Sequence, residues 1–235
     1  MNGAPATSPA RQVDAAEAVH ITAPPGRFVG RGGEKLDGAL RAFAVDPAGR
    51  CAIDVGSSTG GFTDCLLQWG AASVVALDVG RGQLHDRLRR DARVSVHEQT
   101  NVRGADPAAL GGPFDLVVAD LSFTSWRAVA EPVVGLAAPA ADLVLLVKPQ
   151  FEAGHQEVTA GKGVVADPAV WGRALAGAVA ALEGAGAAIM SAMVSPLRGA
   201  DGNVEFFLHL RAGAGPRNGG PDLDALVASV PVRKP

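Results

Sequence analysis

The sequence predicts an α/β fold, with a doubly wound, mostly parallel seven-stranded sheet and helices on both faces. Short, nearly continuous apolar runs recur along the chain, as expected of strands covered on both faces of a parallel sheet. Segments with helical spacing of apolar residues separate most of these runs, which is typical of Rossmann-like folds. The predicted strands are Cys51–Val55, Ser73–Asp78, Val94–His97, Asp115–Asp120, Asp142–Lys148, Ala188–Val194 and Val204–Arg211.

The first helix is expected from Lys35 onward, where Leu36, Leu40 and Phe43 share one face, and it should end at Asp46-Pro47. The later helices separate the strands and carry apolar residues at similar spacing. We expect them at Gly61–Trp69, Gln83–Arg90, Thr124–Ala137 and Pro168–Glu183, with a short turn near Pro107–Leu110.

The chain is expected to hold one folded domain, residues 28–212, between two less ordered ends. Residues 1–27 read as a loose arm with one short strand, Ala18–Thr22, and residues 213–235 as a flexible tail rich in glycine and proline. Inside the domain, the polar, glycine-bearing stretch Phe151–Asp167 is too long for an ordinary connection. We therefore expect it to be an active-site loop.

Composition restricts the function classes. The net charge of −3 gives no global basic signature, so contact with nucleic acid would have to come from a local patch or a partner. Cys51 and Cys65 have no His or Cys at metal-ligand spacing, so no metal site is expected and both fit a reducing cytoplasm. The apolar runs are too short to span a bilayer, so the protein is expected to be cytoplasmic, without membrane contact.

A glycine-rich turn follows the first strand and opens a helix, where backbone can approach a ligand closely. The spacing is neither that of a dinucleotide fingerprint nor that of a P-loop. The second strand ends in Asp78, about 20 residues on, where a carboxylate can accept hydrogen bonds from a ribose diol. These features predict a nucleoside cofactor without a pyrophosphate, which describes S-adenosylmethionine; a simple tight turn is the alternative. The candidate cofactor-binding residues are Asp54, Gly56, Ser57, Ser58, Thr59, Gly60, Gly61, Phe62, Asp78, Val79, Thr100, Asn101 and Asp120.

Asp120 and Lys148 end the fourth and fifth predicted strands, so both should emerge at the carboxyl edge of the sheet, where ligands bind. Lysine can act as a proton acceptor there, whereas arginine stays charged. Lys35 precedes the sheet, and Glu205 lies in the last predicted strand beside two phenylalanines. A lysine reaching for solvent and a strand-end ion pair are the alternatives for these positions.

These residues fall within motifs that together resemble the TlyA (haemolysin A-like) family, which belongs with the FtsJ-like ribose 2′-O-methyltransferases. The resemblance covers about residues 28–212. The motifs are the runs Val29–Leu36, Ser58–Thr63, Asp78–Leu84, Asp120–Phe123 and Val147–Glu152, and Ser195-Pro196 with Gly202–Glu205. The resemblance implies a methyltransferase sheet, S-adenosylmethionine as cofactor and a catalytic tetrad of Lys35, Asp120, Lys148 and Glu205. It also implies ribosomal RNA cytidines as targets.

Members of that family normally begin with an S4-type RNA-binding domain, and the stretch Arg11–Thr22 resembles only the last strand of one. An arginine cluster could contact phosphates or could be a solvated helix face. Three functions stay open: 2′-O-methylation of RNA or a ribosomal subunit, O-methylation of a small hydroxylated molecule such as a nucleoside or secondary metabolite, and a membrane-active role. The cluster comprises Arg81, Arg87, Arg89, Arg90 and Arg93.

Overall fold

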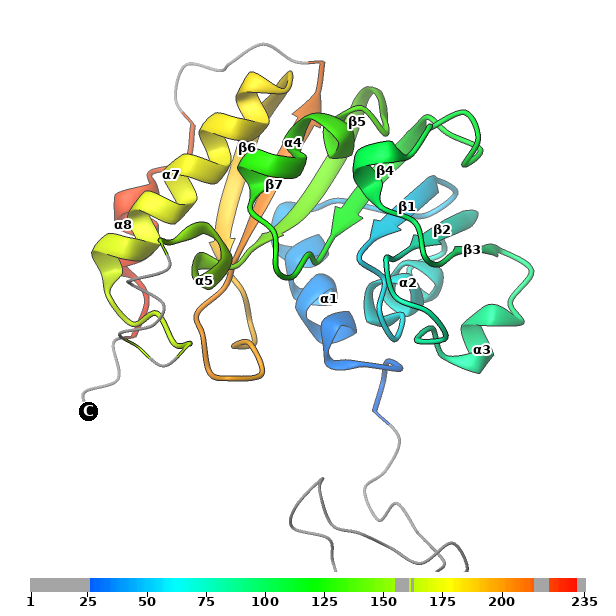
Figure 1. The fold of residues 1–235 in the computed structure, drawn as a ribbon, viewed down its shortest axis with the longest axis horizontal. Coiled ribbons are helices and arrows are strands. Elements are labelled where there is room, and N and C mark those ends of the chain that lie inside the picture. Colours follow the sequence, from blue (N-terminus) through cyan, green and yellow to red (C-terminus); the bar gives the residue numbers. More distant parts are fainter. Residues whose placement is uncertain (1–25, 155–160, 162, 214–219, 232–235) are drawn as a thin grey trace, which may run out of the picture.

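The structure is a computed structural model, and it describes residues 26–154, 161, 163–213 and 220–231. Helices and strands alternate through most of this range (Figure 1). In chain order the elements are α1 (Arg31–Phe43), β1 (Cys51–Val55), α2 (Gly61–Gln68), β2 (Ser73–Leu77), α3 (Asp86–Arg89), β3 (Val94–His97), the 3-10 helix η1 (Val102–Gly104), β4 (Phe114–Ala119), α4 (Trp126–Val134), β5 (Ala137–Val147), α5 (Pro149–Glu152), α7 (Pro168–Gly184), β6 (Ala187–Val194), β7 (Phe206–Ala212) and α8 (Leu223–Ala228).

The strands form one seven-stranded sheet in the order β3-β2-β1-β4-β5-β7-β6. The neighbours from β3 to β5 pair in parallel, and β7 runs antiparallel to both β5 and β6. The predicted doubly wound, mostly parallel sheet is therefore confirmed. Because the strand order reverses between β1 and β4, a ligand is expected in the crevice beyond the carboxyl ends of these two strands.

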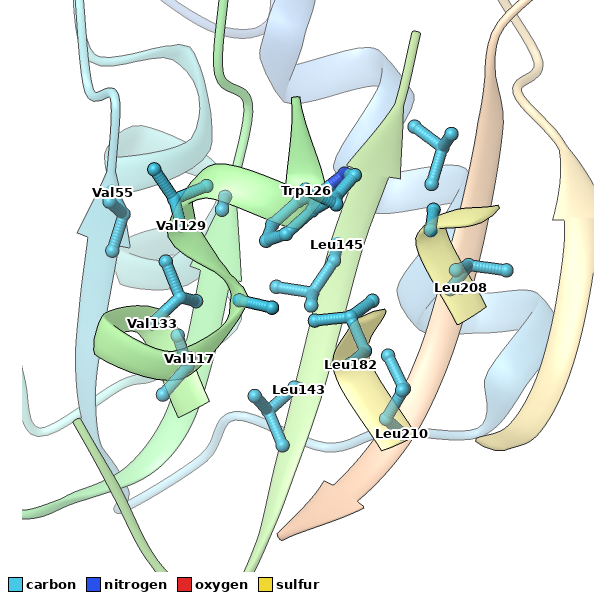
Figure 2. Close-up of a cluster of buried hydrophobic side chains, with 14 of the residues drawn as sticks. Val55, Val117, Trp126, Val129, Val133, Leu143, Leu145, Leu182, Leu208 and Leu210 are labelled. Atoms are coloured by element: carbon cyan, nitrogen blue, oxygen red, sulfur yellow. The ribbon is translucent and has the colours of Figure 1, made fainter. Parts of the chain in front are cut away.

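Helices cover both faces of the sheet, with α1, α2 and α3 on one side and α4, α7 and α8 on the other (Figure 1). Successive strand residues point to opposite faces, so each face has its own apolar cluster. Ile53 lies in the α4 and α7 cluster, whereas Ala52 lies in the α1 and α2 cluster. Figure 2 shows the first cluster, where Leu145 of β5 lies among Val133 of α4 and Leu182 of α7.

Helix α1 begins earlier than its apolar periodicity predicts, at Arg31 instead of Lys35. Gly32 and Gly33 disfavour a helix in isolation. Packing explains the difference, because a Cβ on Gly33 would lie 2.3 Å from Cγ of Phe28. The helix therefore keeps a glycine where the Phe28 side chain, from the turn just before the helix, packs against its backbone.

The C-terminal end also differs from expectation. The tail expected to be flexible over residues 213–235 contains α8, which packs against α7; Val227 of this helix and Val230 just after it are buried. The predicted strand Ala18–Thr22 and the arm before residue 26 lie outside the described residues, as do residues 155–160 and 162 of the expected active-site loop.

Candidate functional site

The glycine turn between β1 and α2 needs glycine at two positions. Gly56 and Gly60 have φ angles of 85° and 95°, a left-handed region that side chains rarely adopt. A Cβ on Gly56 would lie 2.7 Å from the carbonyl oxygen of Asp120, and one on Gly60 would lie 2.2 Å from Leu88. The turn is therefore pressed between the β4 end and α3, and it brings its backbone to the switch point of the sheet.

Two cavities meet at this carboxyl edge. The larger, about 600 Å³, runs from Gly56 along Asp78 and Val79 to Thr100 and Asn101. The smaller, about 260 Å³, lies over the glycine turn and reaches Lys148. Four residues line both cavities: Gly56, Ser58, Asp120 and Ser122. Together the cavities form one continuous candidate site.

Asp78 follows β2 directly and is held by backbone donors on both sides. Its Oδ2 accepts a hydrogen bond from Ser58 N at 2.8 Å, and its Oδ1 accepts one from Gly80 N at 2.7 Å. Each carboxylate oxygen keeps a further lone pair. The side chain is thus fixed in orientation and can still accept hydrogen bonds from a ligand in the larger cavity.

Two predicted cofactor residues support the turn from beneath and line neither cavity. Asp54 is fully buried, and its Oδ2 accepts hydrogen bonds from Thr63 N at 2.9 Å and Thr63 Oγ1 at 2.7 Å. Burial raises the pKa of Asp54 to about 7, although the Thr63 bonds lower it in part. Gly60 allows the close approach of α3. The cavity walls hold the other predicted residues, Gly56, Ser57, Ser58, Thr59, Gly61, Phe62, Asp78, Val79, Thr100, Asn101 and Asp120.

Asp120 and Lys148 meet as the strand order predicts, each one residue beyond its strand. Lys148 Nζ lies 2.5 Å from Asp120 Oδ1, an ion pair without the alignment of a hydrogen bond. The same ammonium donates a hydrogen bond to Ser122 Oγ at 2.9 Å and lies 5.8 Å from the centre of the Phe151 ring. Lys148 is thus anchored on two sides while it lines the smaller cavity.

Lys35 and Glu205 form a second ion pair, at 2.5 Å between Nζ and Oε2. Their side chains are only 9% and 3% exposed, and of the residues described neither is among those lining the two cavities. Gly199 lies close to the Glu205 carboxylate, since a Cβ on this glycine would be 2.7 Å from Glu205 Oε1. Burial raises the pKa of Glu205, and the nearby Lys35 charge opposes this rise. The four predicted catalytic residues therefore form two pairs, one facing the cavity and one behind it.

The comparison with known families assigns the chain to a class of enzyme. The model of the FtsJ-like methyltransferases matches residues 28–212. The chain belongs to the FtsJ-like methyltransferase family. Among its relatives, the 16S/23S rRNA (cytidine-2′-O)-methyltransferase TlyA of Mycobacterium tuberculosis is 50% identical over 212 residues, which cover 90% of this chain and 79% of that protein. Hemolysin A of Brachyspira hyodysenteriae is 34% identical over 210 residues, covering 89% and 87%.

Solved structures agree with this assignment. A candidate hemolysin from Lactococcus lactis is 37% identical, with a TM-score of 0.81 over 86% of this chain and 97% of that one. The N-methyltransferase NodS from Bradyrhizobium japonicum, in complex with S-adenosyl-L-homocysteine, is only 16% identical, with a TM-score of 0.55 over 77% and 87%. The second likeness shows the shared fold alone. The predicted methyltransferase activity and TlyA-type family are confirmed.

Two structural findings concern the membrane-active role and a metal site. Within the described ranges, no helix is long and apolar enough to cross a membrane. In the same part of the chain, no group of three His, Cys, Asp or Glu side chains could hold a metal ion.

Sequence reasoning assigned no role to several residues that the structure places in the site. Ser122 anchors Lys148, and Phe151 lies beside it. Phe123 is 93% exposed and has a φ of 61°, an unusual combination for an aromatic residue. The motifs that carry the family resemblance contain all three, so their position within those motifs was the available signal.

Proposed function

We propose that this methyltransferase transfers a methyl group from S-adenosylmethionine to a ribose 2′-hydroxyl of ribosomal RNA. One observation carries the proposal: the Lys148 and Asp120 pair lies where the smaller cavity joins the larger one. A basic group beside a nucleoside-sized cavity is what activation of a hydroxyl for methyl transfer requires. The M. tuberculosis relative, named for cytidine 2′-O-methylation of 16S and 23S rRNA, supports the same reaction.

The cavities fit S-adenosylmethionine in size and in chemistry. A volume of about 600 Å³ lies within the range of small-molecule sites, and its wall combines apolar and polar groups. Asp78 would accept hydrogen bonds from the ribose hydroxyls, and Val79, which is 69% exposed, would lie against the adenine. The glycine turn would hold the amino-acid end of S-adenosylmethionine. The turn is close-packed and lacks the glycine spacing of a phosphate-binding loop. When bound, the cofactor supplies an electrophilic methyl group on a sulfonium.

The residues of this chain then have distinct roles. Lys148, as the neutral amine, would hold the 2′-hydroxyl and take its proton, becoming the ammonium, as the oxygen forms its bond to the methyl carbon and the carbon–sulfur bond breaks. Asp120 and Ser122 hold Lys148 Nζ from two directions, which limits its orientations. The buried Lys35 and Glu205 pair would act on this centre through its charges, because the charges of Lys148 and Asp120 also influence the pKa of Glu205.

The arrangement of arginines favours RNA over a small molecule as acceptor. Arg87, Arg89, Arg90 and Arg93 of the predicted cluster all form ion pairs with nearby acids, so a solvated face describes them well. Other arginines at the carboxyl edge have no acidic partner among the described residues. They are Arg31, Arg81, Arg103 and Arg198, and Arg103 lines the larger cavity. Unpaired cations around an active site suit a polyanionic substrate.

Transfer of labelled methyl from S-adenosylmethionine tests the proposal, with purified ribosomal subunits and free nucleosides as competing acceptors. We expect label in RNA at a dinucleotide that resists alkaline cleavage, because a methylated 2′-oxygen cannot attack the neighbouring phosphate. The Lys148→Ala variant is the matched inactive control. Labelled nucleosides together with unlabelled ribosomal RNA would overturn the RNA assignment and favour the small-molecule alternative.

A further inference from the structure

We infer that Glu152 is a positioning residue, whose carboxylate and Trp126 together hold the loop carrying Asp120 against the segment carrying Lys148. This inference rests on the proposed function, because it concerns the same reacting pair. Glu152 and Trp126 make no contact with the substrate in this scheme. They act through Lys148 and Asp120.

The backbone N of Asp120 still donates a hydrogen bond to Val55 O of β1 at 3.1 Å, but no strand pairing joins Asp120 to Lys148. The paired register of β4 and β5 ends at Ala119 and Leu145, before either Asp120 or Lys148. Residues 120–125 then run without regular structure and include Phe123 at a φ of 61°. A loop of this kind needs an anchor at its far end to keep one conformation.

Trp126 provides that anchor, because it forms hydrogen bonds to residues that come before and after Lys148 in the sequence. Its backbone N donates a hydrogen bond to Glu152 Oε1 at 2.8 Å, and its indole Nε1 donates one to the Leu146 carbonyl oxygen at 3.2 Å. The ring is 3% exposed and lies in the core between α4 and β5 (Figure 2). The loop end is therefore tied to the chain two residues before Lys148 and four residues after it.

Local helix chemistry explains why an acceptor is needed here. The N-terminal amides of α4 lack intrahelical partners, and its N-cap residue, Ser125, makes no side-chain cap. Glu152 supplies the acceptor from another element and places negative charge at the positive end of the helix. Helix α5, only four residues long, is too short to be stable on its own. The same contact therefore stabilises the segment that follows Lys148.

Three substitutions separate position from charge. Glu152→Gln keeps an amide oxygen at the same reach and removes the charge, and we expect it to be tolerated because the hydrogen bond from Trp126 N is kept and burial raises the pKa of Glu152. Glu152→Asp keeps the charge but shortens the reach, and Glu152→Ala removes both. Glu131→Ala, at an exposed position on the same helix, is the control.

We expect kcat for methyl transfer to ribosomal subunits to fall at least ~10-fold in the Ala and Asp variants, since small misplacements of reacting groups can cost up to ~100-fold. The Gln and control variants should stay within about threefold of the wild type, and the cofactor Kd should change less than about threefold in all four. Thermal unfolding confirms that each variant folds. Wild-type kcat in Glu152→Ala, or an active Asp variant beside an inactive Gln variant, would overturn the inference.

A separate measurement distinguishes failure of the inference from failure of the proposed function. If the wild type labels no RNA, the proposed function is wrong, and the crystal structure of Glu152→Ala then decides the inference. A separation of Lys148 Nζ and Asp120 Oδ1 well beyond the 2.5 Å of the wild type supports the positioning role. An unchanged separation refutes it.

Discussion

Replacing Asp54 by Asn should stabilise the protein strongly at pH 8 and much less at pH 5. Burial, against the hydrogen bonds from Thr63 and with a smaller contribution from the nearby carboxylates of Asp120 and Asp78, raises the pKa of Asp54 to about 7. Asp54 Oδ1 has no hydrogen-bond partner among the described residues. Asn keeps the oxygen that accepts from Thr63 and removes a buried charge that the two Thr63 hydrogen bonds compensate only in part.

The sign and size of the effect follow from proton linkage. The folded pKa lies above the ordinary value of 3.8, so the folded protein binds more protons between the two values, and stability falls as pH rises through this window. Each unit of difference corresponds to about 1.4 kcal/mol, which gives a penalty of roughly 4 kcal/mol above pH 7. At pH 5 only about 1 to 2 kcal/mol of it is present. The variant should therefore gain about 2 to 3 kcal/mol more at pH 8 than at pH 5.

Urea unfolding of wild type and variant at both pH values measures this difference. Asp46→Asn, at an exposed position with a local cap to Ala48 N, is the control and should respond equally at both pH values. A stabilisation by Asp54→Asn that is the same at pH 5 and pH 8, within about 0.5 kcal/mol, would show that Asp54 does not titrate in this window. The account of the buried carboxyl beneath the glycine turn would then be wrong.

Three further predictions concern the paired lysines and the unpaired arginines. Lys148→Arg and Lys148→Ala should both lose ~100- to 10,000-fold in kcat, because arginine cannot release a proton and alanine has none to exchange. Both variants should still bind cofactor, as measured by calorimetry. Substantial activity in the arginine variant would leave Lys148 only an electrostatic role. Glu205→Ala should lower the free energy of unfolding by on the order of 3 to 5 kcal/mol, because the substitution leaves Lys35 charged and buried. The double variant with Lys35→Met should recover most of this loss. No recovery in urea unfolding would contradict the prediction. Arg103→Ala should raise KM for ribosomal subunits and reduce the log–log salt slope by about 1, whereas the ion-paired Arg93→Ala should change neither.

The strands were predictable because their signal is local. The run that ends at Val147 is continuous, short and apolar, which is typical of a strand covered on both faces. Because strand ends were predictable, so was the meeting of Asp120 and Lys148, since parallel strands end at one edge. The first part of β5 was missed, because Ala137–Ala141 contains small residues and Pro139, with no apolar pattern to mark it.

Contacts made through space could not be predicted in the same way. Phe28 is near Gly33 in the sequence, but the spacing of apolar residues does not show that the two are packed together, so α1 was expected to begin too late. The apolar residues of α8 lie in a segment whose glycine and proline content predicts a loose tail, yet Val227 is buried against α7. The bond from Trp126 to Glu152 joins residues 26 positions apart, and only the fold brings them together.

Lys35 and Lys148 show how one residue type serves two purposes in a single site. The Nζ atom of each lysine lies 2.5 Å from a carboxylate oxygen, so the ion pair alone does not distinguish them. Exposure to the cavity does: Lys148 lines the smaller cavity and has a hydroxyl partner from the neighbouring loop, whereas Lys35 is closed off with Glu205 beneath Gly199. A buried pair away from the ligand cannot exchange protons with it, and it contributes fixed charge. Under the proposed function, the tetrad would therefore consist of one reactive pair, Lys148 and Asp120, and one pair, Lys35 and Glu205, that sets the electrostatic field around it.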